Sequence, residues 1–588
     1  MEISKSFVIM KILRREHIEF FWKYIKIHKK LLILSIIVVP FLSAMHLCQP
    51  YIVKMGIDNY IFSKELKGLY FLSIIFVFVV MMEFLLRSLQ SYIFQYIGQR
   101  TVSRMRRDLF EHIQELPLSH FDDSSLGESS SSVISDMQAL NESLSSGIVT
   151  LLSDLLIFIG ILGMMFYLNV SLSLIFIVSI PLIFLVINFI RKRMKRLFFL
   201  IREKMSTING LLQENLQGSL VIQLFEKEES FEGLLKDASV EYRHVVMRSV
   251  GYDSVLFSFI EMMMFVVIAI FLWFCFKGSF AGEGISLGVL VAFIDYTYKL
   301  FSPLKDFSGK WTVLQHALAA LQRIFRAFEK EKEKNEGLVR LTELEGKVSF
   351  KNVSFCYNLK NTSSVLKNVS FDISPGQSVA IVGPSASGKT TIMRLILRLY
   401  SGYSGKIFLD NCDIQKIDIY SLRKNISVIL QEQSLFPSSV AFNITLGKDS
   451  ISTQKMQKCA KMVHVHDFIQ SLPKGYDTVL DQNNVLSQGQ SQLISMARVL
   501  AHSPKIVLMD EPMASLDSYH ETIVQKGIRE ILKNKTTFVI AHRLSTVQQV
   551  DKILVVKHGQ IVEEGNHLEL MALGGFYRRL FNMQFKNM

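Results

Sequence analysis

Long apolar runs occupy the first half of the chain and do not recur in the second. Six runs approach the roughly 20 residues that an α-helix needs to cross the hydrocarbon core of a bilayer. They are Leu31 to Val53, Leu69 to Leu89, Ile148 to Leu168, Ser171 to Ile190, Val255 to Phe276 and Leu287 to Leu304. Any single run is compatible with a buried helix of a soluble protein. Six runs that all end before residue 305 instead predict a bundle of six transmembrane helices.

The lysine and arginine residues indicate on which side of the membrane the connections lie. They are concentrated before the first run (Lys23, Lys26, Lys29, Lys30), after the second (Arg100, Arg104, Arg106, Arg107) and after the fourth (Arg191, Lys192, Arg193, Lys195, Arg196, Arg202, Lys204). Cytoplasmic connections carry an excess of these residues, so we expect a multi-pass protein of the cytoplasmic membrane with both chain ends in the cytoplasm. Residues 1–30 form a basic amphipathic segment suited to the inner membrane surface, and no cleavable signal peptide is expected there.

Two of the cytoplasmic connections, residues 90–147 and 191–254, are unusually long. Each is polar with periodic apolar positions, which predicts helices that continue out of the membrane. Each also contains a turn-rich reversal. The two reversals, near residues 115–130 and 207–220, are therefore expected to lie against a soluble domain.

The composition excludes several classes of protein. The chain has 588 residues, of which 49% are hydrophobic, and a formal net charge of +13. Its hydrophobicity excludes disorder, and five cysteines without paired or CxxC spacing encode neither a disulfide scaffold nor a zinc site. A basic excess can indicate nucleic-acid binding, but here the charge flanks the membrane runs, where it suits anionic lipid. We therefore expect contact with membrane lipid and none with nucleic acid.

The second half of the chain alternates strand-like and helical segments, which indicates an α/β domain. We place this domain at residues 346–588, after a transmembrane domain at 1–330 and a charged linker at 331–345. Residues 383–390 read GPSASGKT, a complete P-loop pattern with an apolar strand before it and a helix after it. In such a loop, backbone N–H groups hold phosphate oxygens, a lysine reaches the β- and γ-phosphates, and a hydroxyl ligates Mg²⁺. The predicted ATP-binding residues here are Gly383, Pro384, Ser385, Ala386, Ser387, Gly388, Lys389, Thr390 and Thr391.

A second motif supplies two carboxylates. The apolar strand Ile506 to Met509 ends in Asp510 and Glu511. Asp510 suits an aspartate that holds Mg²⁺, and Glu511 suits a residue that polarises the attacking water. The alternative is that both acids only terminate the strand, which the P-loop upstream disfavours. The predicted fold class is thus a membrane α-helical bundle followed by an α/β P-loop ATPase domain.

Further motifs in this domain resemble those of the ATP-binding cassette (ABC) transporters. The sequence LSQGQ, at Leu486, Ser487, Gln488, Gly489 and Gln490, is similar to the family signature. Gln431 resembles the Q-loop glutamine, Asp517 the D-loop aspartate, His542 the switch histidine and Tyr357 the adenine-stacking aromatic, although a tyrosine is also common in an ordinary strand. The resemblance implies catalytic roles for Glu511, His542 and Gln431, and a Mg²⁺ site at Thr390, Gln431 and Asp510.

Six membrane runs followed by one cassette resemble an exporter-type half-transporter of the bacterial multidrug-resistance-like and lipid-exporter-like branch. The resemblance implies a dimer in which the signature of one chain contacts the ATP held by the other. It also implies ATP-driven export by alternating access, and we expect a small amphiphilic substrate, drug-like or lipid. A peptide substrate, or a non-transporting ATP-gated channel or sensor, is the alternative.

Some positions depart from the family pattern. The segment Asp481 to Val485 lacks the glutamate that usually precedes the signature, and Gln482 stands in its place. The resemblance implies coupling helices near residues 115–130 and 207–220, and we expect altered communication with them. Ser491 replaces a usual basic residue and Pro512 a usual alanine. Because Glu511 and His542 are both present, a homodimer and a heterodimer with a degenerate partner both stay open.

The membrane runs offer few clues to the substrate. Asp295 and Lys299 lie four residues apart in the sixth run, on one helical face. Either they line a polar cavity or they neutralise each other without contacting substrate. In the fifth run, the flexible side chains of Met262, Met263 and Met264 suit variable apolar ligands, although such residues are often only packing.

Overall fold

The computed structural model describes residues 15–61, 63–123, 132–144, 148–280, 285–335, 337–341, 343–357, 364–431, 435–481, 486–512, 518–541 and 547–585. The chain divides into two compact units. The helical unit comprises Met1–Gln114 and Leu126–Lys330, and the sheet unit comprises Glu115–Ser125 and Glu331–Met588. A short piece of the first cytoplasmic connection thus belongs to the sheet unit.

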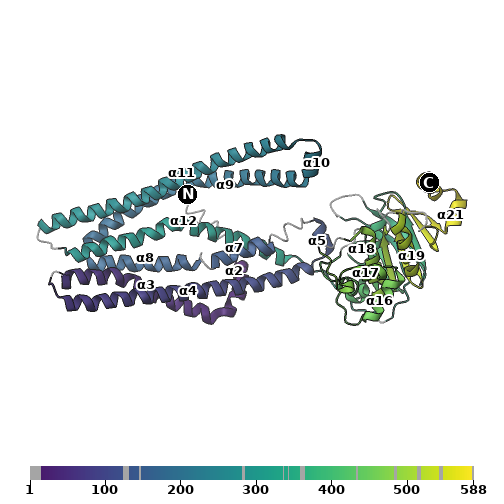
Figure 1. Cartoon of the computed structure of the whole chain (residues 1–588), viewed down its shortest axis with the longest axis horizontal. Coiled ribbons are helices and arrows are strands. Elements are labelled where there is room, and N and C mark those ends of the chain that lie inside the picture. Colours follow the sequence, from purple (N-terminus) through teal and green to yellow (C-terminus); the bar gives the residue numbers. More distant parts are fainter. Residues whose placement is uncertain are drawn as a thin grey trace. The chain divides into compact units, whose positions relative to one another are not determined.

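The helical unit consists of long helices that lie side by side (Figure 1). In chain order its elements are α2 (Arg15–Ile25), η1 (Lys26–His28), α3 (Lys29–Met55), the π-helical turn η2 (Gly56–Ile61), α4 (Leu66–Gln114), η3 (Ser132–Asp136), α7 (Met137–Glu142), α8 (Ile148–Leu168), α9 (Val170–Gln217), α10 (Ser219–Leu224), α11 (Glu228–Phe280) and α12 (Leu287–Glu329). Each of the six apolar runs lies within one helix, in the order α3, α4, α8, α9, α11 and α12.

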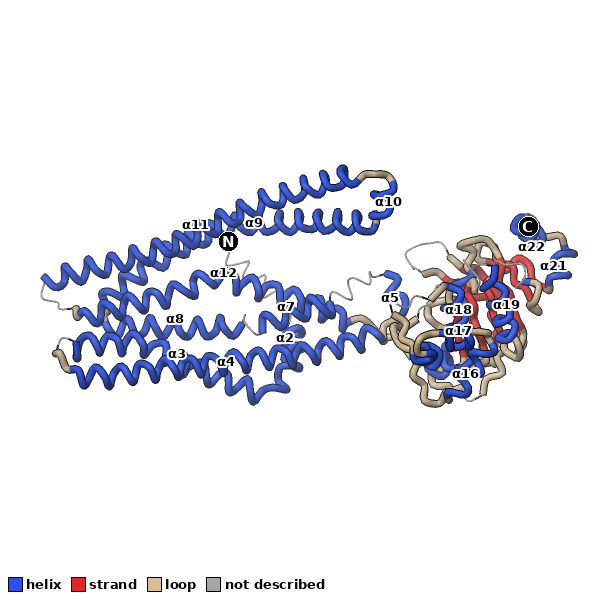
Figure 2. The backbone as a smooth tube through the Cα atoms, viewed as in Figure 1, coloured by secondary structure: helices blue, strands red, loops and turns tan. Residues whose placement is uncertain are grey.

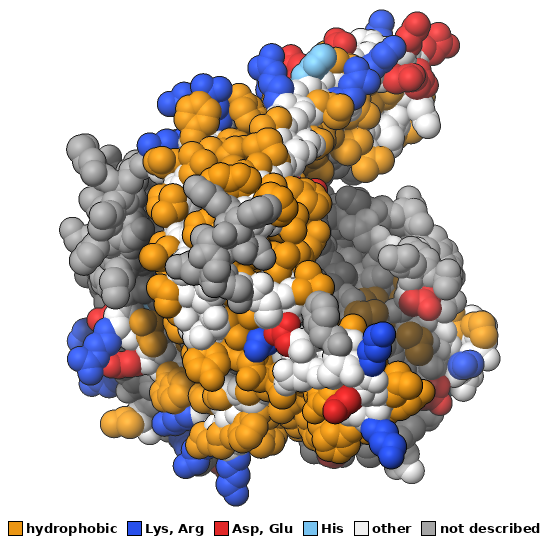
Figure 3. Space-filling view, turned by 90° about the vertical axis from the view of Figure 1, so that its left-hand side faces the viewer, with side chains coloured by type: hydrophobic (Ala, Val, Ile, Leu, Met, Phe, Trp, Pro, Cys, Tyr) orange, Lys and Arg blue, Asp and Glu red, His pale blue; other side chains and the backbone are white. Residues whose placement is uncertain are grey.

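Several of these helices have the length and composition of membrane spans. Among the described residues, four stretches are long and apolar enough to cross a bilayer: Arg15–Ile61, Leu66–Gln114, Val170–Gln217 and Glu228–Phe276. Ser153–Leu168 is a shorter apolar helix. Their outward surfaces are also apolar, and hydrophobic side chains cover much of the end view in Figure 3. An apolar exterior over apolar interhelical contacts is what lipid requires of a helix bundle.

The helical unit contains two apolar cores. One joins α8, α9, α11 and α12 and fully buries Phe176, Phe271 and Phe301. The other joins α2, α4, α7 and α12 and fully buries Met105 and Ile324. Beyond these cores, α9 and α11 form a long hairpin with α10 at its tip (Figure 2).

The sheet unit contains two sheets. Its strands are β1 (Val348–Phe355), β2 (Leu366–Ile373), β3 (Ser378–Val382), β4 (Ser404–Leu409), β5 (Cys412–Asp413), β6 (Ile426–Ile429), β7 (Ile506–Asp510), β8 (Thr536–Ile540), β9 (Lys552–Lys557) and β10 (Gln560–Gly565). The four-stranded sheet has the order β2-β1-β4-β5 and is antiparallel. The six-stranded sheet has the order β10-β9-β3-β8-β7-β6, and all its pairs are parallel except that of the edge strand β10.

Helices surround these sheets. They are α5 (Leu118–Asp123), α13 (Lys389–Ile396), η5 (Ile414–Lys416), α14 (Ile419–Lys424), α15 (Val440–Thr445), α16 (Thr453–Met462), α17 (His466–Ser471), η6 (Gly475–Asp477), α18 (Gln488–His502), α19 (Ser518–Leu532), α21 (His567–Leu573) and α22 (Phe576–Phe585).

Both faces of the parallel sheet are buried. In β3, Val379 and Ile381 belong to the core shared with the four-stranded sheet, whereas Ala380 and Val382 belong to the core shared with helices α15 to α19. Burial on both faces explains why these strands read as continuous apolar runs rather than alternating ones. It also holds their carboxyl ends rigidly at one edge, where the predicted site lies.

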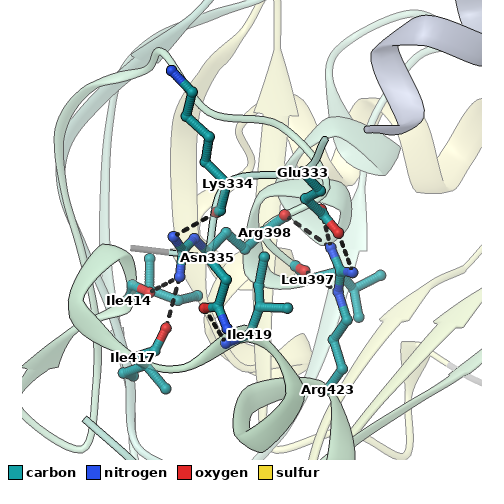
Figure 4. A network of polar contacts seen from close by, with 9 residues as sticks. All are labelled: Glu333, Lys334, Asn335, Leu397, Arg398, Ile414, Ile417, Ile419 and Arg423. Carbon is teal, nitrogen blue, oxygen red and sulfur yellow. Dashed lines mark hydrogen bonds and ion pairs between the residues drawn. The ribbon is translucent and has the colours of Figure 1, made fainter. Parts of the chain in front are cut away.

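The linker is fastened to the sheet unit (Figure 4). Arg423 donates to both carboxylate oxygens of Glu333, over 2.8 and 2.6 Å. Arg398, which follows α13, donates to the carbonyl of Ile417 at 2.7 Å. Asn335 donates to Asp418 at 2.7 Å. Glu333 and Asn335 thus connect the beginning of the predicted linker to α14 and to Asp418, the residue just before it.

Candidate nucleotide site and its relatives

The P-loop connects β3 to α13 at the carboxyl end of the parallel sheet. Two of its glycines have conformations that other residues rarely adopt, with φ of +155° at Gly383 and +104° at Gly388. A Cβ atom at Gly383 would lie 2.0 Å from the carbonyl oxygen of Val556, and one at Gly388 would lie 2.7 Å from a methyl group of Leu366. Only glycine therefore fits at both positions. The resulting tight loop ends at the N-terminus of α13, where N–H groups are available to an anion.

Lys389 is the first residue of α13 and is 7% exposed. Its Nζ donates to the carbonyl oxygens of Gly383 (2.8 Å) and Pro384 (2.9 Å), so the ammonium group lies over the loop. Burial lowers the pKa of Lys389 below its ordinary value, although the charges of Glu511 and Asp510 act in the opposite direction. A buried cation beside the loop fits a phosphate group, and the two nearby acids have the chemistry that suits a metal ion.

Asp510 and Glu511 reach the same edge of the sheet as the P-loop. Strands β3 and β7 both pair in parallel with β8, so their carboxyl ends lie on the same side. Thr390 donates a side-chain hydrogen bond to Asp510. Burial, and then the charge of Glu511, raise the pKa of Asp510 above its ordinary value. The structure thus brings together Lys389, Thr390, Asp510 and Glu511, whose two motifs are far apart in the sequence.

Gln431 joins this group. Its Nε2 donates to a carboxylate oxygen of Glu511 at 3.2 Å. Glu511 has φ of +45°, a conformation uncommon for a residue with a side chain, and its N–H donates to the carbonyl of Ile540 on β8. The neighbouring strand therefore contributes to the position of this carboxylate.

The residues present fit a nucleotide with Mg²⁺. Ser387 is 4% exposed, and its Oγ has no hydrogen-bond partner among the described residues, which leaves a buried polar atom in the P-loop. The described part of the chain contains no group of three His, Cys, Asp or Glu residues that could hold a metal by itself. A hydroxyl, an amide and one carboxylate, at Thr390, Gln431 and Asp510, instead match a cation that also keeps water and phosphate ligands.

Tyr357 belongs to an aromatic group beside the P-loop helix. Its hydroxyl lies 3.0 Å from Oγ1 of Thr391, and its side chain is partly exposed. Its ring meets that of Tyr400 edge-on, with centroids 5.0 Å apart. The Arg394 guanidinium lies 6.0 Å from the centroids of both rings. Arg394 and Tyr400 belong to no sequence motif, and only packing brings them beside Tyr357.

The signature residues form the start of α18. Ser487 is the N-cap: its Oγ accepts from the Gln490 N–H, and the Gln490 side chain accepts from the Ser487 N–H. This reciprocal capping box uses two N–H groups of the first turn. Gln492, one turn further, donates to the Pro512 carbonyl, so α18 is connected to the residue that follows Glu511.

The remaining predicted residues cannot be placed. Asp517, His542 and Gln482 lie outside the described residues. Of the segment Asp481 to Val485, only Asp481 is described.

Comparison with known proteins agrees with this arrangement. Residues 32–304 match the ABC transporter transmembrane region, and residues 366–514 match the ABC transporter family. The chain is 33% identical over 572 residues to the uncharacterized ABC transporter ATP-binding protein YfiC of Bacillus subtilis (strain 168), which covers 96% of this chain and 94% of that protein. It is 33% identical over 506 residues to an ATP-dependent lipid A-core flippase of Methylococcus capsulatus, with 85% and 84% covered.

A solved structure supports the same assignment. The chain resembles a bacterial Atm1-family ABC exporter with ATP bound, with a TM-score of 0.77, 25% identity and coverage of 95% of this chain and 98% of that one. Fold and site together define an ATP-driven membrane transporter, in which ATP hydrolysis is coupled to export. The chain belongs to the ABC transporter family and is an exporter-type half-transporter. The predicted fold class is thereby confirmed.

Proposed function

We propose that two such chains form a dimer that exports a small amphiphilic compound across the cytoplasmic membrane by alternating access. The observation that carries this proposal is the convergence of Lys389, Asp510, Glu511 and Gln431 at one edge of the sheet, in a chain whose other half is a bundle of apolar helices. ATP hydrolysis at that edge is the energy source. The excess of basic residues beside the spans supports a cytoplasmic location for both termini and the sheet unit.

Each polar group of the site has a role in this proposal. The loop from Gly383 to Gly388 holds the phosphates, and Lys389 neutralises the β- and γ-phosphates. Thr390, Gln431 and Asp510 hold Mg²⁺, which supplies positive charge to the phosphate oxygens. Glu511 polarises the attacking water, and Gln431 orients the Glu511 carboxylate through their hydrogen bond. We assign His542 to the γ-phosphate on the family pattern.

The signature supports a dimer. In our proposal, Ser487 and Gly489 at the N-terminus of α18 contact the γ-phosphate of ATP held by the other chain. The tip of the α9–α11 hairpin supports the same arrangement. Its apolar side chains Leu216, Leu220, Leu224 and Phe225 are 66 to 74% exposed. An exposed apolar cluster at a hairpin tip suits a docking contact, which we assign to the sheet unit of the second chain.

The transport cycle follows from differential binding. ATP contacts both chains only when the two sheet units are closed, so ATP shifts the population toward the closed dimer. Closure favours an outward-open arrangement of the membrane helices. Loss of the γ-phosphate contacts after hydrolysis then returns the dimer to the inward-open arrangement.

The test is transport by the full chain in proteoliposomes. ATP-dependent accumulation of a fluorescent amphiphile should require hydrolysis and stop in Glu511→Gln, which should retain ATP binding while turnover falls by about 100-fold or more. Glu530→Gln, a change at a carboxylate on α19 that pairs with Lys533, is the matched control and should transport normally. Normal hydrolysis in Glu511→Gln would contradict the role of Glu511. Flux supported equally by a non-hydrolysable ATP analogue would indicate a gated channel instead of a pump.

A further inference from the structure

Asp295 and Lys299, both on α12, do not form an isolated ion pair. The Nζ atom of Lys299 lies 3.8 Å from the Asp295 carboxylate but only 2.7 Å from Oε1 of Gln49 and 3.1 Å from the carbonyl oxygen of His46, both on α3. Two of its three contacts are therefore shorter and point to another helix. The Lys299 side chain is also more buried than the Asp295 side chain, with exposed fractions of 19% and 46%.

The α3 residues that contact Lys299 also contact a carboxylate on α4. Gln49 donates to one carboxylate oxygen of Glu83 on α4, and Nε2 of His46 lies 3.0 Å from the other oxygen. Lys299 has three protons, and its three contacts are with Gln49, His46 and Asp295. Lys299 and Glu83 thus belong to a network that joins α12 to α3 and α4, and among the described residues Lys299 connects Asp295 to that network.

Asp295 lies on the face of α12 that points away from the helical core. Phe293, Tyr296 and Leu300 are fully buried and face the core formed with α8, α9 and α11. Asp295 and Tyr298 lie on the other face, where Tyr298 is 45% exposed. These two residues are three apart, so their side chains neighbour each other along the helix.

Asp295 lies within the sixth apolar run, Leu287 to Leu304, where a carboxylate does not suit contact with lipid chains. Ionisable groups within membrane helices face the interior of the assembly or a water-filled cavity, and they mark substrate pathways. A carboxylate binds a cation by charge, and a neighbouring tyrosine ring attracts the same cation through its face. Asp295 and Tyr298 therefore give this partly exposed face of α12 the chemistry of a cation site, and Lys299, the neighbouring cation, is already held by α3.

We propose that Asp295 and Tyr298 form the headgroup site for a lipophilic organic cation, which is the substrate class of this exporter. The inference rests on the proposed export function and narrows it. The apolar part of such a cation would contact the flanking apolar positions of α12, and Lys299 would position the carboxylate from the α3 side. Asp295 and Tyr298 are then residues that determine specificity.

The test uses two probes that share shape and size but differ in charge, the tetraphenylphosphonium cation and the tetraphenylborate anion. Equilibrium binding of each ion to the full chain in lipid nanodiscs is measured, and binding to protein-free nanodiscs of the same lipid is subtracted, because the interfacial dipole potential makes the borate partition into the bilayer more strongly than the phosphonium. The wild type should bind the phosphonium at least tenfold more tightly than the borate. Equal binding of the two ions would overturn the proposal, and this comparison requires no variant.

Variants then locate the site. Asp295→Asn should weaken phosphonium binding at least tenfold, Asp295→Glu should restore most of it, and Tyr298→Leu should weaken it about threefold. Glu65→Gln, a carboxylate change in the exposed segment before α4, should leave phosphonium binding unchanged. Unchanged phosphonium binding in a folded Asp295→Asn protein would overturn the assignment.

The ATPase activity of the wild type shows whether only the proposed substrate class is wrong or the proposed export function as well. If the wild type hydrolyses ATP and Glu511→Gln does not, but the phosphonium binds without regard to Asp295, only the substrate class is wrong. If the wild type hydrolyses no ATP in either the presence or absence of the phosphonium, the proposed export function itself fails.

Discussion

The Tyr400 hydroxyl donates a hydrogen bond to the Asp122 carboxylate, across 278 residues of sequence. Asp122 lies on α5, the short helix of the first cytoplasmic connection, and Leu118 of the same helix packs against the core between the two sheets. The Tyr400 ring meets that of Tyr357, the proposed adenine-stacking residue, edge-on. Burial, and next the hydrogen bond to Asp122, raise the pKa of Tyr400, so its hydroxyl stays a donor at any physiological pH. Two side-chain contacts thus connect the proposed adenine site to α5.

Tyr400→Phe should weaken the coupling between ATP hydrolysis and transport. The substitution removes the hydroxyl and keeps the ring beside Tyr357, so basal ATPase activity should change less than twofold. Transport per ATP hydrolysed should fall severalfold, because α5 loses its polar contact with the segment that follows the P-loop helix. The loss in stability should be about 1 kcal/mol, as for one hydrogen bond. Parallel measurement of ATPase activity and substrate flux in proteoliposomes tests this.

Tyr577→Phe is the matched control. It also removes a tyrosine hydroxyl, which lies 2.8 Å from Nδ1 of His567 near the C-terminal helices. It should leave transport per ATP unchanged. An equal loss of coupling in both variants would contradict a specific role for the contact between Tyr400 and Asp122.

Gly383→Ala should reduce ATP binding at least tenfold. The new methyl group would meet the Val556 carbonyl oxygen 2.0 Å away, in a backbone conformation with φ of +155°, so the P-loop has to move away from β9. Titration with a fluorescent ATP analogue measures the loss. Gly210→Ala, on α9 with no atom within 4 Å of the added carbon, should bind ATP normally.

Glu333→Gln should destabilise the sheet unit by about 1.5 to 3 kcal/mol, because Arg423 loses a charged partner in a half-buried, two-bond contact. Glu331→Gln removes an exposed carboxylate, two residues before Glu333, that pairs with Lys334, and it should cost at most about 1 kcal/mol. Thermal unfolding of the two variants under identical conditions measures the difference. Equal melting temperatures would show that the linker contact does not contribute to stability.

Asp58→Asn should loosen the N-terminal end of α12. The Asp58 carboxylate accepts hydrogen bonds from the Ser286 hydroxyl (2.7 Å) and the Gly288 N–H (2.9 Å), at the start of that helix. Loss of the negative charge at a helix N-terminus should cost about 0.3 to 1 kcal/mol. The melting temperature in detergent should fall by a few degrees, whereas Glu232→Gln, an exposed change on α11, should not alter it.

The sequence determined the class of this protein because its strongest signals are local. An apolar run long enough to span a bilayer is visible as consecutive residues, and a P-loop is a contiguous pattern whose glycines reflect backbone geometry. The helical membrane domain, the α/β ATPase domain and the family were accessible in this way. The capping box of Ser487 and Gln490 is similarly local, although the sequence analysis did not name it.

Contacts between distant residues were decided only by the tertiary structure. Glu333 and Arg423 are separated by 90 residues, and Gln49 and Lys299 by 250. No pattern predicts such pairs, because packing of whole helices and strands brings their side chains within reach. Asp295 and Lys299 show the difference most clearly. Their spacing placed them on one helical face, but hydrogen bonds from Lys299 to α3 decided that the lysine turns away and leaves the carboxylate partly exposed.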